Sequence, residues 1–193
     1  MTEIDIFLRI DETTDDSVRA YAFIGLCVSL VSEIEHKLFH CFNHILRGDR
    51  TANAKRFYKG LGLARRWKLA DEAVRGMIQN EHALSTWAHL INETERLCGS
   101  DSIRNIVAHH PLRRHIHIRT HPDGSPEMVD GSAIYAELAV QLDRNVVLAG
   151  RRPVAKHTPS DLRQYAAELL HLYHGLYDFD DKYLRPPFLA DPN

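Results

Sequence analysis

The 193-residue chain has only three cysteines, and none of them forms a CxxC pair. Two of them, Cys27 and Cys41, lie two heptads apart in a segment with helical periodicity, which separates them by about 21 Å. That distance excludes a disulfide between them. Cys98 has no base beside it in the sequence, so a structural thiol is expected there rather than a nucleophile. We therefore expect reduced thiols and a reducing compartment.

Long hydrophobic runs are missing as well. The longest, from Ala20 to Val31, has about a dozen residues, whereas a membrane-spanning helix needs roughly 20. The N-terminal sequence MTEIDIFLRIDETTDD is acidic and lacks the cationic region of a signal peptide. These absences predict a soluble, cytoplasmic protein with no membrane partner.

Neither sign of charge dominates the chain. It has 24 Lys and Arg against 26 Asp and Glu, a formal net charge of −2. This balance excludes a generally cationic surface that binds nucleic acid, but it is compatible with a local basic site. The hydrophobic fraction of 44% is typical of a globular protein, and the length suggests one domain over residues 1–193. The abundant residue is histidine, with 13 copies, which raises the question of metal binding or acid–base chemistry.

Helical periodicity covers most of the chain outside one internal segment. Thr14-Asp15-Asp16 predicts an N-cap for a long helix that ends near Gly48. Further helices are expected over the following ranges: 51–79, broken at Gly60 and Gly62; 81–98; a short helix 103–110; and a last helix opened by Thr158-Pro159-Ser160-Asp161. Residues 1–14 are interpreted as a short leader without clear periodicity, and residues 186–193 as a tail.

Residues 112–157 lack the helical periodicity of the rest of the chain. Arg113–Thr120 alternates in polarity, which predicts a strand, and the turn sequence His121-Pro122-Asp123-Gly124-Ser125 follows it. Beyond the turn, strands are possible at Glu127–Asp130 and Val146–Leu148, while residues 134–142 are equally compatible with a helical turn. The predicted fold class is mainly α: an antiparallel bundle of four to five helices with a small β-hairpin insertion before the last helix.

One segment combines residues that suit phosphate chemistry, namely Ser102-Ile103-Arg104-Asn105-Ile106-Val107-Ala108-His109-His110-Pro111. Arg104 offers a permanently charged fork that matches a phosphate, and His109 is a side chain that exchanges a proton near neutral pH. No carboxylate cluster for Mg²⁺ accompanies them. The combination suits RNA cleavage by the RNA's own 2′-OH, with Asn105 orienting the phosphate or the imidazole. The plainer interpretation is an ion-paired Arg104 and a His109 that caps the helix C-terminus.

Arg104-Asn105-x-x-Ala108-His109, late in a helical chain, resembles the HEPN family (higher eukaryotes and prokaryotes nucleotide-binding domains). Its pattern is an Arg, a polar residue that is often Asn, and a His four to six residues after the Arg. The resemblance covers about residues 15–183 as architecture and is specific over 104–109. It implies a homodimeric helical bundle in which two motifs form one metal-independent endoribonuclease site, with no cofactor and no metal.

The resemblance further implies RNA as the substrate, a 2′,3′-cyclic phosphate product, and a toxin-like or defence role with an antitoxin or regulatory protein as a possible partner. A family variant carries Tyr two residues after the His, and Pro111 at this position argues against the antitoxin chemistry of that variant. Family members without activity bind nucleotides or proteins. The alternative function is therefore a non-catalytic HEPN-like bundle that binds a partner protein or a nucleotide.

Several residues outside the motif are weaker candidates. Arg113, Arg114 and His110 follow it directly and are predicted to bind flanking phosphates of the substrate. Glu33, on the long helix, is a candidate supporting acid. His115 and His117 on the predicted strand have a spacing that suits a metal ion, against a plainer interpretation as a polar face. His36, His40 and His44, at helical spacing, are candidates for binding a metal or lining a dimer groove, again against a plainer interpretation as a polar face.

Overall fold

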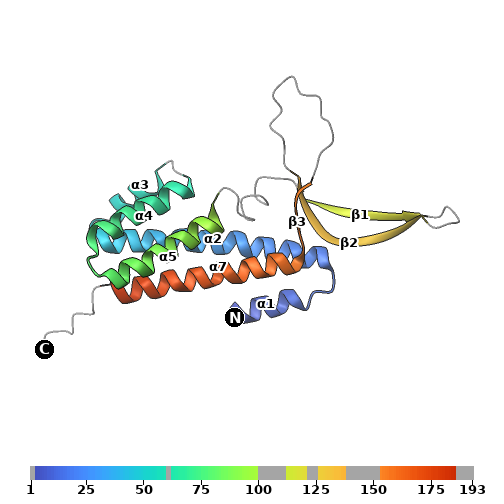
Figure 1. Cartoon of the computed structure of the whole chain (residues 1–193), viewed down its shortest axis with the longest axis horizontal. Helices are drawn as coiled ribbons and strands as arrows, with labels where there is room; N and C mark the ends of the chain where they lie inside the picture. Colours follow the sequence, from blue (N-terminus) through green and yellow to red (C-terminus); the bar gives the residue numbers. More distant parts are fainter. Residues whose placement is uncertain (1–2, 60–61, 100–111, 121–125, 138–152, 186–193) are drawn as a thin grey trace, which may run out of the picture. The chain divides into compact units, whose positions relative to one another are not determined.

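The computed structural model describes residues 3–59, 62–99, 112–120, 126–137 and 153–185, and it is mainly helical, which confirms the predicted fold class (Figure 1). The helices are α1 (Glu3–Asp11), α2 (Asp16–Leu46), α3 (Arg50–Tyr58), α4 (Leu63–Met77), α5 (Glu81–Cys98) and α7 (Pro159–Phe179), which runs into a short π-helix, η1 (Asp180–Leu184). The strands are β1 (Leu112–Thr120), β2 (Pro126–Glu137) and β3 (Pro153–His157). None of the described helices has the length and apolar composition needed to span a bilayer.

The chain divides into two compact units with three boundaries, two of which fall inside the long helices α2 and α7. The first unit comprises residues 1–28 and 103–166, and the second comprises residues 29–102 and 167–193. The first unit therefore contains α1, the sheet, the first part of α2 and the start of α7. The second contains the rest of α2 and α7 together with α3, α4 and α5.

The sheet has the strand order β1-β2-β3 and is antiparallel throughout. The strand expected at Arg113–Thr120 corresponds to β1, and that at Glu127–Asp130 lies inside the longer β2. The helical alternative for residues 134–142 is wrong for positions 134–137, because they pair with β1 or β3. The strand expected at Val146–Leu148 lies outside the described residues, and β3 was not predicted.

Helix α2 begins and ends close to the predicted residues. The carboxylate of Asp15 accepts a hydrogen bond from the backbone N–H of Val18 at 3.1 Å, which confirms the N-cap. The helix ends at Leu46, and the left-handed residue after it is Arg47, with φ 47°, rather than Gly48. The buried apolar face follows the predicted period and comprises Ala20, Phe23, Cys27, Leu30, Val31, Ile34, Leu38, Phe39, Cys41 and Phe42.

The prediction of an irregular leader over residues 1–14 is wrong, because Glu3–Asp11 forms α1. A nine-residue helix is marginal on its own in water, so contacts with the rest of the first unit must hold it. Phe7 packs on Phe23 with ring centroids 5.9 Å apart, and Asp11 accepts a hydrogen bond from Arg163 at 2.9 Å. The sequence pattern carries no direct sign of these contacts, which explains the missed helix.

Helix α7 begins at the predicted proline. The hydroxyl of Thr158 accepts a hydrogen bond from the backbone N–H of Asp161 at 3.1 Å, and the Asp161 carboxylate accepts one from the backbone N–H of Thr158 at 2.8 Å. This reciprocal pair is a capping box, and Pro159 occupies the first helical position, where a backbone N–H is not required. The start of α7 is therefore set locally by four consecutive residues.

Aromatic side chains join the helices of the second unit. Phe57 of α3 lies between Phe39 and Phe42 of α2, with ring centroids 5.5 and 5.4 Å away. Trp87 of α5 packs on Phe179 of α7 at 5.0 Å. The break predicted within residues 51–79 is confirmed, since α3 and α4 are separate helices.

All three thiols are buried, and burial raises the pKa of Cys27 to about 12. Because the thiolate is the reactive form, we expect negligible alkylation of the folded protein by iodoacetamide at pH 8 and modification of three cysteines in urea. Mass spectrometry before and after unfolding measures this. A cysteine that is alkylated rapidly in the folded protein would contradict the structure.

Gly99 ends α5, and a Cβ at this position would run into the backbone carbonyl of Glu95. We expect Gly99→Ala to lower the free energy of unfolding by about 1–3 kcal/mol, the usual cost of overpacking. Gly76 of α4 is the matched control, because a Cβ there meets no atom within 4 Å. Gly76→Ala should raise stability by about 1 kcal/mol through helix propensity. Urea titration of both variants distinguishes the two cases, and equal effects would be inconsistent with the close approach at Gly99.

Candidate functional site

The predicted catalytic residues Arg104, Asn105 and His109, and the predicted substrate contact His110, lie outside the described residues. Their segment follows α5 and precedes β1 in the chain. The roles assigned to these residues therefore stay predictions from the sequence.

Arg113 and Arg114 lie at the start of β1, where the backbone pairs them with Tyr135 and Ile134 of β2. The register shifts between Arg114 and Ile116, where a step of two residues in β1 faces a step of four in β2. The extra residues of this irregularity therefore lie in β2, opposite His115. The metal hypothesis for His115 and His117 stays a prediction from the sequence.

Glu33 is exposed on α2 in the second unit. It is available to solvent, and its proposed support of Arg104 and His109 stays a prediction, because both of those residues lie outside the described part of the chain.

Two buried charges of the second unit, Asp180 and Lys37, lie in a group of side chains that was not predicted from the sequence. We call it the Asp180 cluster; it comprises Asp180, Lys37, His44 and Arg185. The Asp180 side chain is fully buried, and one of its oxygens accepts from the Lys37 ammonium at 3.2 Å. The other lies 2.6 Å from Nδ1 of His44, and the Arg185 guanidinium completes the group at 3.6 Å. A buried carboxylate is tolerated when it is paired and hydrogen-bonded in this way.

Helix geometry explains why these side chains meet. Lys37 and His44 are seven residues apart, two turns of α2, and therefore lie on one face of that helix. Asp180 is the first residue of η1, directly after α7, and π-helical turns often occur at functional positions. The Lys37 ammonium also lies 4.2 Å from the centroid of the Tyr177 ring. Its positive charge is therefore stabilised by both the Asp180 carboxylate and the aromatic ring.

The Asp180 carboxylate can accept only from a protonated nitrogen, so Nδ1 of His44 carries the proton. This leaves Nε2 of His44 as the ring atom with a free lone pair when the imidazole is neutral. A carboxylate that orients an imidazole is also the arrangement of a general base. Here Lys37 and Arg185 share the same carboxylate, and the direct consequence of the cluster is to tie α2 to the end of α7 within the second unit.

Beside this cluster, His36, His40 and His44 follow one another at single-turn spacing on α2; we call them the histidine stripe. The Nε2 atoms of His36 and His40 are 2.9 Å apart, and the ring centroids of His40 and His44 are 5.8 Å apart. Burial, reinforced by the positive charges of His36, Lys37 and Arg50, lowers the pKa of His40 to about 4. His40 is therefore a neutral imidazole at pH 7. Among the described residues, no three His, Cys, Asp or Glu side chains gather as a metal site.

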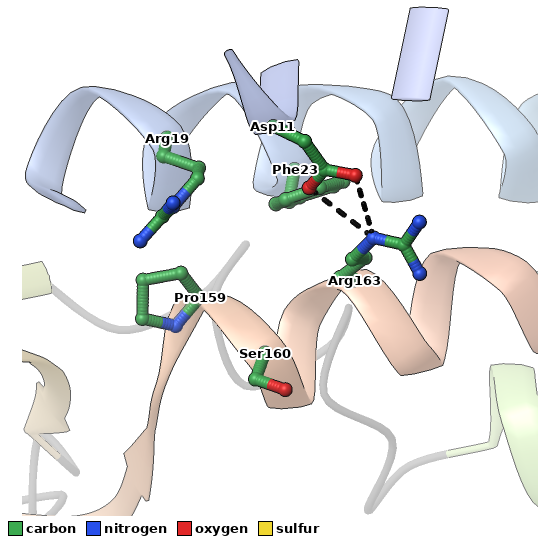
Figure 2. Close-up of a pocket in the computed structure, with 6 residues that line it drawn as sticks. All are labelled: Asp11, Arg19, Phe23, Pro159, Ser160 and Arg163. Carbon is green, nitrogen blue, oxygen red and sulfur yellow. Dashed lines mark hydrogen bonds and ion pairs between the residues drawn. The ribbon is translucent and has the colours of Figure 1, made fainter. Parts of the chain in front are cut away.

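The first unit contains a pocket of about 190 Å³ between α1, α2 and the start of α7. Its lining residues are Asp11, Arg19, Phe23, Pro159, Ser160 and Arg163. Figure 2 shows Arg19 over Pro159, while Arg163 is turned toward the carboxylate of Asp11. The pocket is smaller than the roughly 300–1,000 Å³ of common ligand sites, and the Arg163 guanidinium in its lining is already paired with Asp11. It therefore does not by itself indicate a nucleotide site.

Comparisons with known proteins add no relative. No protein-family model, no curated protein and no solved structure matches the chain. The resemblance carried by Arg104, Asn105 and His109 therefore rests on the residues of the motif.

One residue of the Asp180 cluster, Lys37, is unusual for its position in the sequence. Lys37 falls within the apolar period of α2, between Ile34 and Cys41, where a charged residue is out of place. A lysine at such a position implies a buried acidic partner. Nothing in the sequence selects Asp180 among the neighbouring acids Asp178 and Asp181, because the choice depends on how α7 ends.

The Asp180 cluster predicts an asymmetric response to mutation. We expect Asp180→Leu to lower the free energy of unfolding by about 3–5 kcal/mol, because it leaves the Lys37 ammonium buried without its acid. Lys37→Met should cost less, because Asp180 keeps His44 and Arg185. The double variant should be more stable than the sum of the two effects by about 1 kcal/mol or more.

The control is the exposed pair of Glu93 and Arg96, whose hydrogen bond lowers the pKa of Glu93. Glu93→Gln should change stability by less than about 1 kcal/mol, as is usual for surface pairs. Chemical denaturation of all variants provides the measurement. Additive effects of the Asp180 and Lys37 substitutions would show that the two charges do not stabilise each other.

Proposed function

We propose that the chain is a metal-independent endoribonuclease that cleaves RNA through attack of its own 2′-OH. The observation that carries this proposal is the sequence Arg104-Asn105-x-x-x-His109, placed after α5 in a mainly helical chain. The helices before the motif and α7 after it support the proposal, because the family that the motif resembles uses a helical bundle. The Arg, Asn and His provide the chemistry without any metal ligand.

In the proposed reaction the 2′-oxygen attacks the adjacent phosphorus and the bond from phosphorus to the 5′-oxygen breaks. His109 moves protons to and from these two oxygens, which requires a group that titrates near neutral pH. Arg104 offsets the negative charge that builds on the phosphoryl oxygens, and Asn105 orients either the phosphate or the imidazole. The products are a 2′,3′-cyclic phosphate and a 5′-OH.

The proposal extends to a homodimer in which two copies of the motif form one composite site. Arg113, Arg114 and His110 would bind the flanking phosphates, and Glu33 would support the site. A net charge of −2 fits a small paired site better than a broad basic surface. A toxin-like or defence role, with a regulatory protein that restrains the nuclease, follows from the resemblance alone.

The test is incubation of the purified full chain with total RNA in excess EDTA. We expect cleavage by the wild type and a rate at least about 100-fold lower for His109→Ala and Arg104→Ala, as for loss of a general acid–base group. His171→Ala, at an exposed position on α7, is the matched control and should cleave normally. The 3′ ends of the products should carry the cyclic phosphate.

Two outcomes would overturn the proposal. Cleavage that persists in His109→Ala would indicate a contaminating nuclease, and no cleavage by the wild type in buffers from pH 6 to 9 would remove the assigned activity. In the second case, filter binding of nucleotides and capture of a partner protein would test the alternative of a non-catalytic bundle.

A further inference from the structure

Among the described residues, His36 and His40 are the pair of side chains best arranged to bind a ligand outside the proposed ribonuclease site. Both side chains come from α2, one turn apart, and their Nε2 atoms point at each other across 2.9 Å. Their rings stand edge to face with centroids 4.6 Å apart. His36 is exposed, so the gap between the two nitrogens can be reached from solvent.

Two imidazole nitrogens that bind one ion at about 2.1 Å each lie about 3.0–3.4 Å apart, for angles at the metal between about 90° and 109°. The observed separation of 2.9 Å differs from this range by a few tenths of an ångström or less. Small changes in the side-chain torsions are therefore enough to admit an ion. Without an ion, the same separation is a hydrogen bond in which one Nε2–H donates to the other ring.

From this convergence we propose that His36 and His40 form a bidentate site for a divalent transition metal of the Cu²⁺, Ni²⁺ and Zn²⁺ class. Both rings bind through Nε2 and carry their protons on Nδ1. The ring that donates the hydrogen bond in the ion-free pair therefore transfers its proton from Nε2 to Nδ1 through water, and both imidazoles stay neutral with no net proton release. Imidazole favours these borderline ions over Mg²⁺ and Ca²⁺, which prefer oxygen ligands.

The surroundings set the strength of this site. No third His, Cys, Asp or Glu among the described residues converges on the pair, so water completes the coordination. His44 stands one turn further on, with Nδ1 held by Asp180 at 2.6 Å. Lys37 and Arg50 lie close enough to act electrostatically on His40, and their positive charges oppose a bound cation. The result is an exchangeable site rather than a structural metal centre.

The experiment is titration of the EDTA-stripped full chain with Ni²⁺ by calorimetry, repeated with Cu²⁺ and Mg²⁺. The test variant is His36→Gln/His40→Gln. The matched control is His82→Gln/His89→Gln, which removes two histidines of α5 that are seven residues apart and do not form such a pair. Circular dichroism in EDTA verifies that each variant is folded; His36→Gln alone, at an exposed position, is the second variant if the double one unfolds.

We expect the wild type and the α5 control to bind one more equivalent of Ni²⁺ than His36→Gln/His40→Gln. His36→Gln alone should weaken this site about 100-fold, because it removes the second linked donor. Cu²⁺ should bind more tightly than Ni²⁺, and Mg²⁺ should not bind. Equal stoichiometry and affinity in the wild type and His36→Gln/His40→Gln would overturn the proposal, as would absence of Ni²⁺ binding to the wild type.

Discussion

The carboxylate of Asp180 is the constraint on which the arrangement of the second unit depends. It is fully buried, and its two oxygens face the Lys37 ammonium and the His44 ring. Removing a carboxylate and an ammonium from water costs several kcal/mol each, and only their close pairing with further hydrogen bonds offsets it. The packing of α2 against the end of α7 within this unit is therefore specific, because a shift of either helix would leave one of the charges buried alone.

This constraint also determines where the histidine stripe lies. Lys37 and His44 occupy the side of α2 that meets Asp180, which leaves His36 and His40 toward the rim of that side. His40 is partly withdrawn from water and surrounded by positive charge, which lowers its pKa, while His36 stays exposed. The neutral His40 therefore lies beside the accessible His36 because Lys37 and His44 pack toward Asp180.

Most of the helical framework was predictable because its signals are local. The caps at Asp15 and Thr158, the break before Gly62 and the apolar period of α2 each act within a few residues of the element that they define. Helix α1 and the Asp180 cluster depend instead on contacts that include pairs more than a hundred positions apart, namely Asp11 with Arg163 and Lys37 with Asp180. Sequence periodicity carries no information on such pairings. The strongest chemical motif, around Arg104 and His109, was likewise evident from the sequence and remains a prediction from it.

The two proposals concern different histidines and respond oppositely to metal removal. The proton transfer proposed for His109 and the charge stabilisation proposed for Arg104 need no ion, so a chelator should leave the proposed ribonuclease reaction intact. In the proposed metal site, His36 and His40 lose the bound ion under the same conditions and return to a hydrogen bond between two neutral rings. Thirteen histidines in one chain therefore do not indicate one function. Their meaning depends on the neighbours of each ring: an arginine and an asparagine in one case, and a second imidazole one helical turn away in the other.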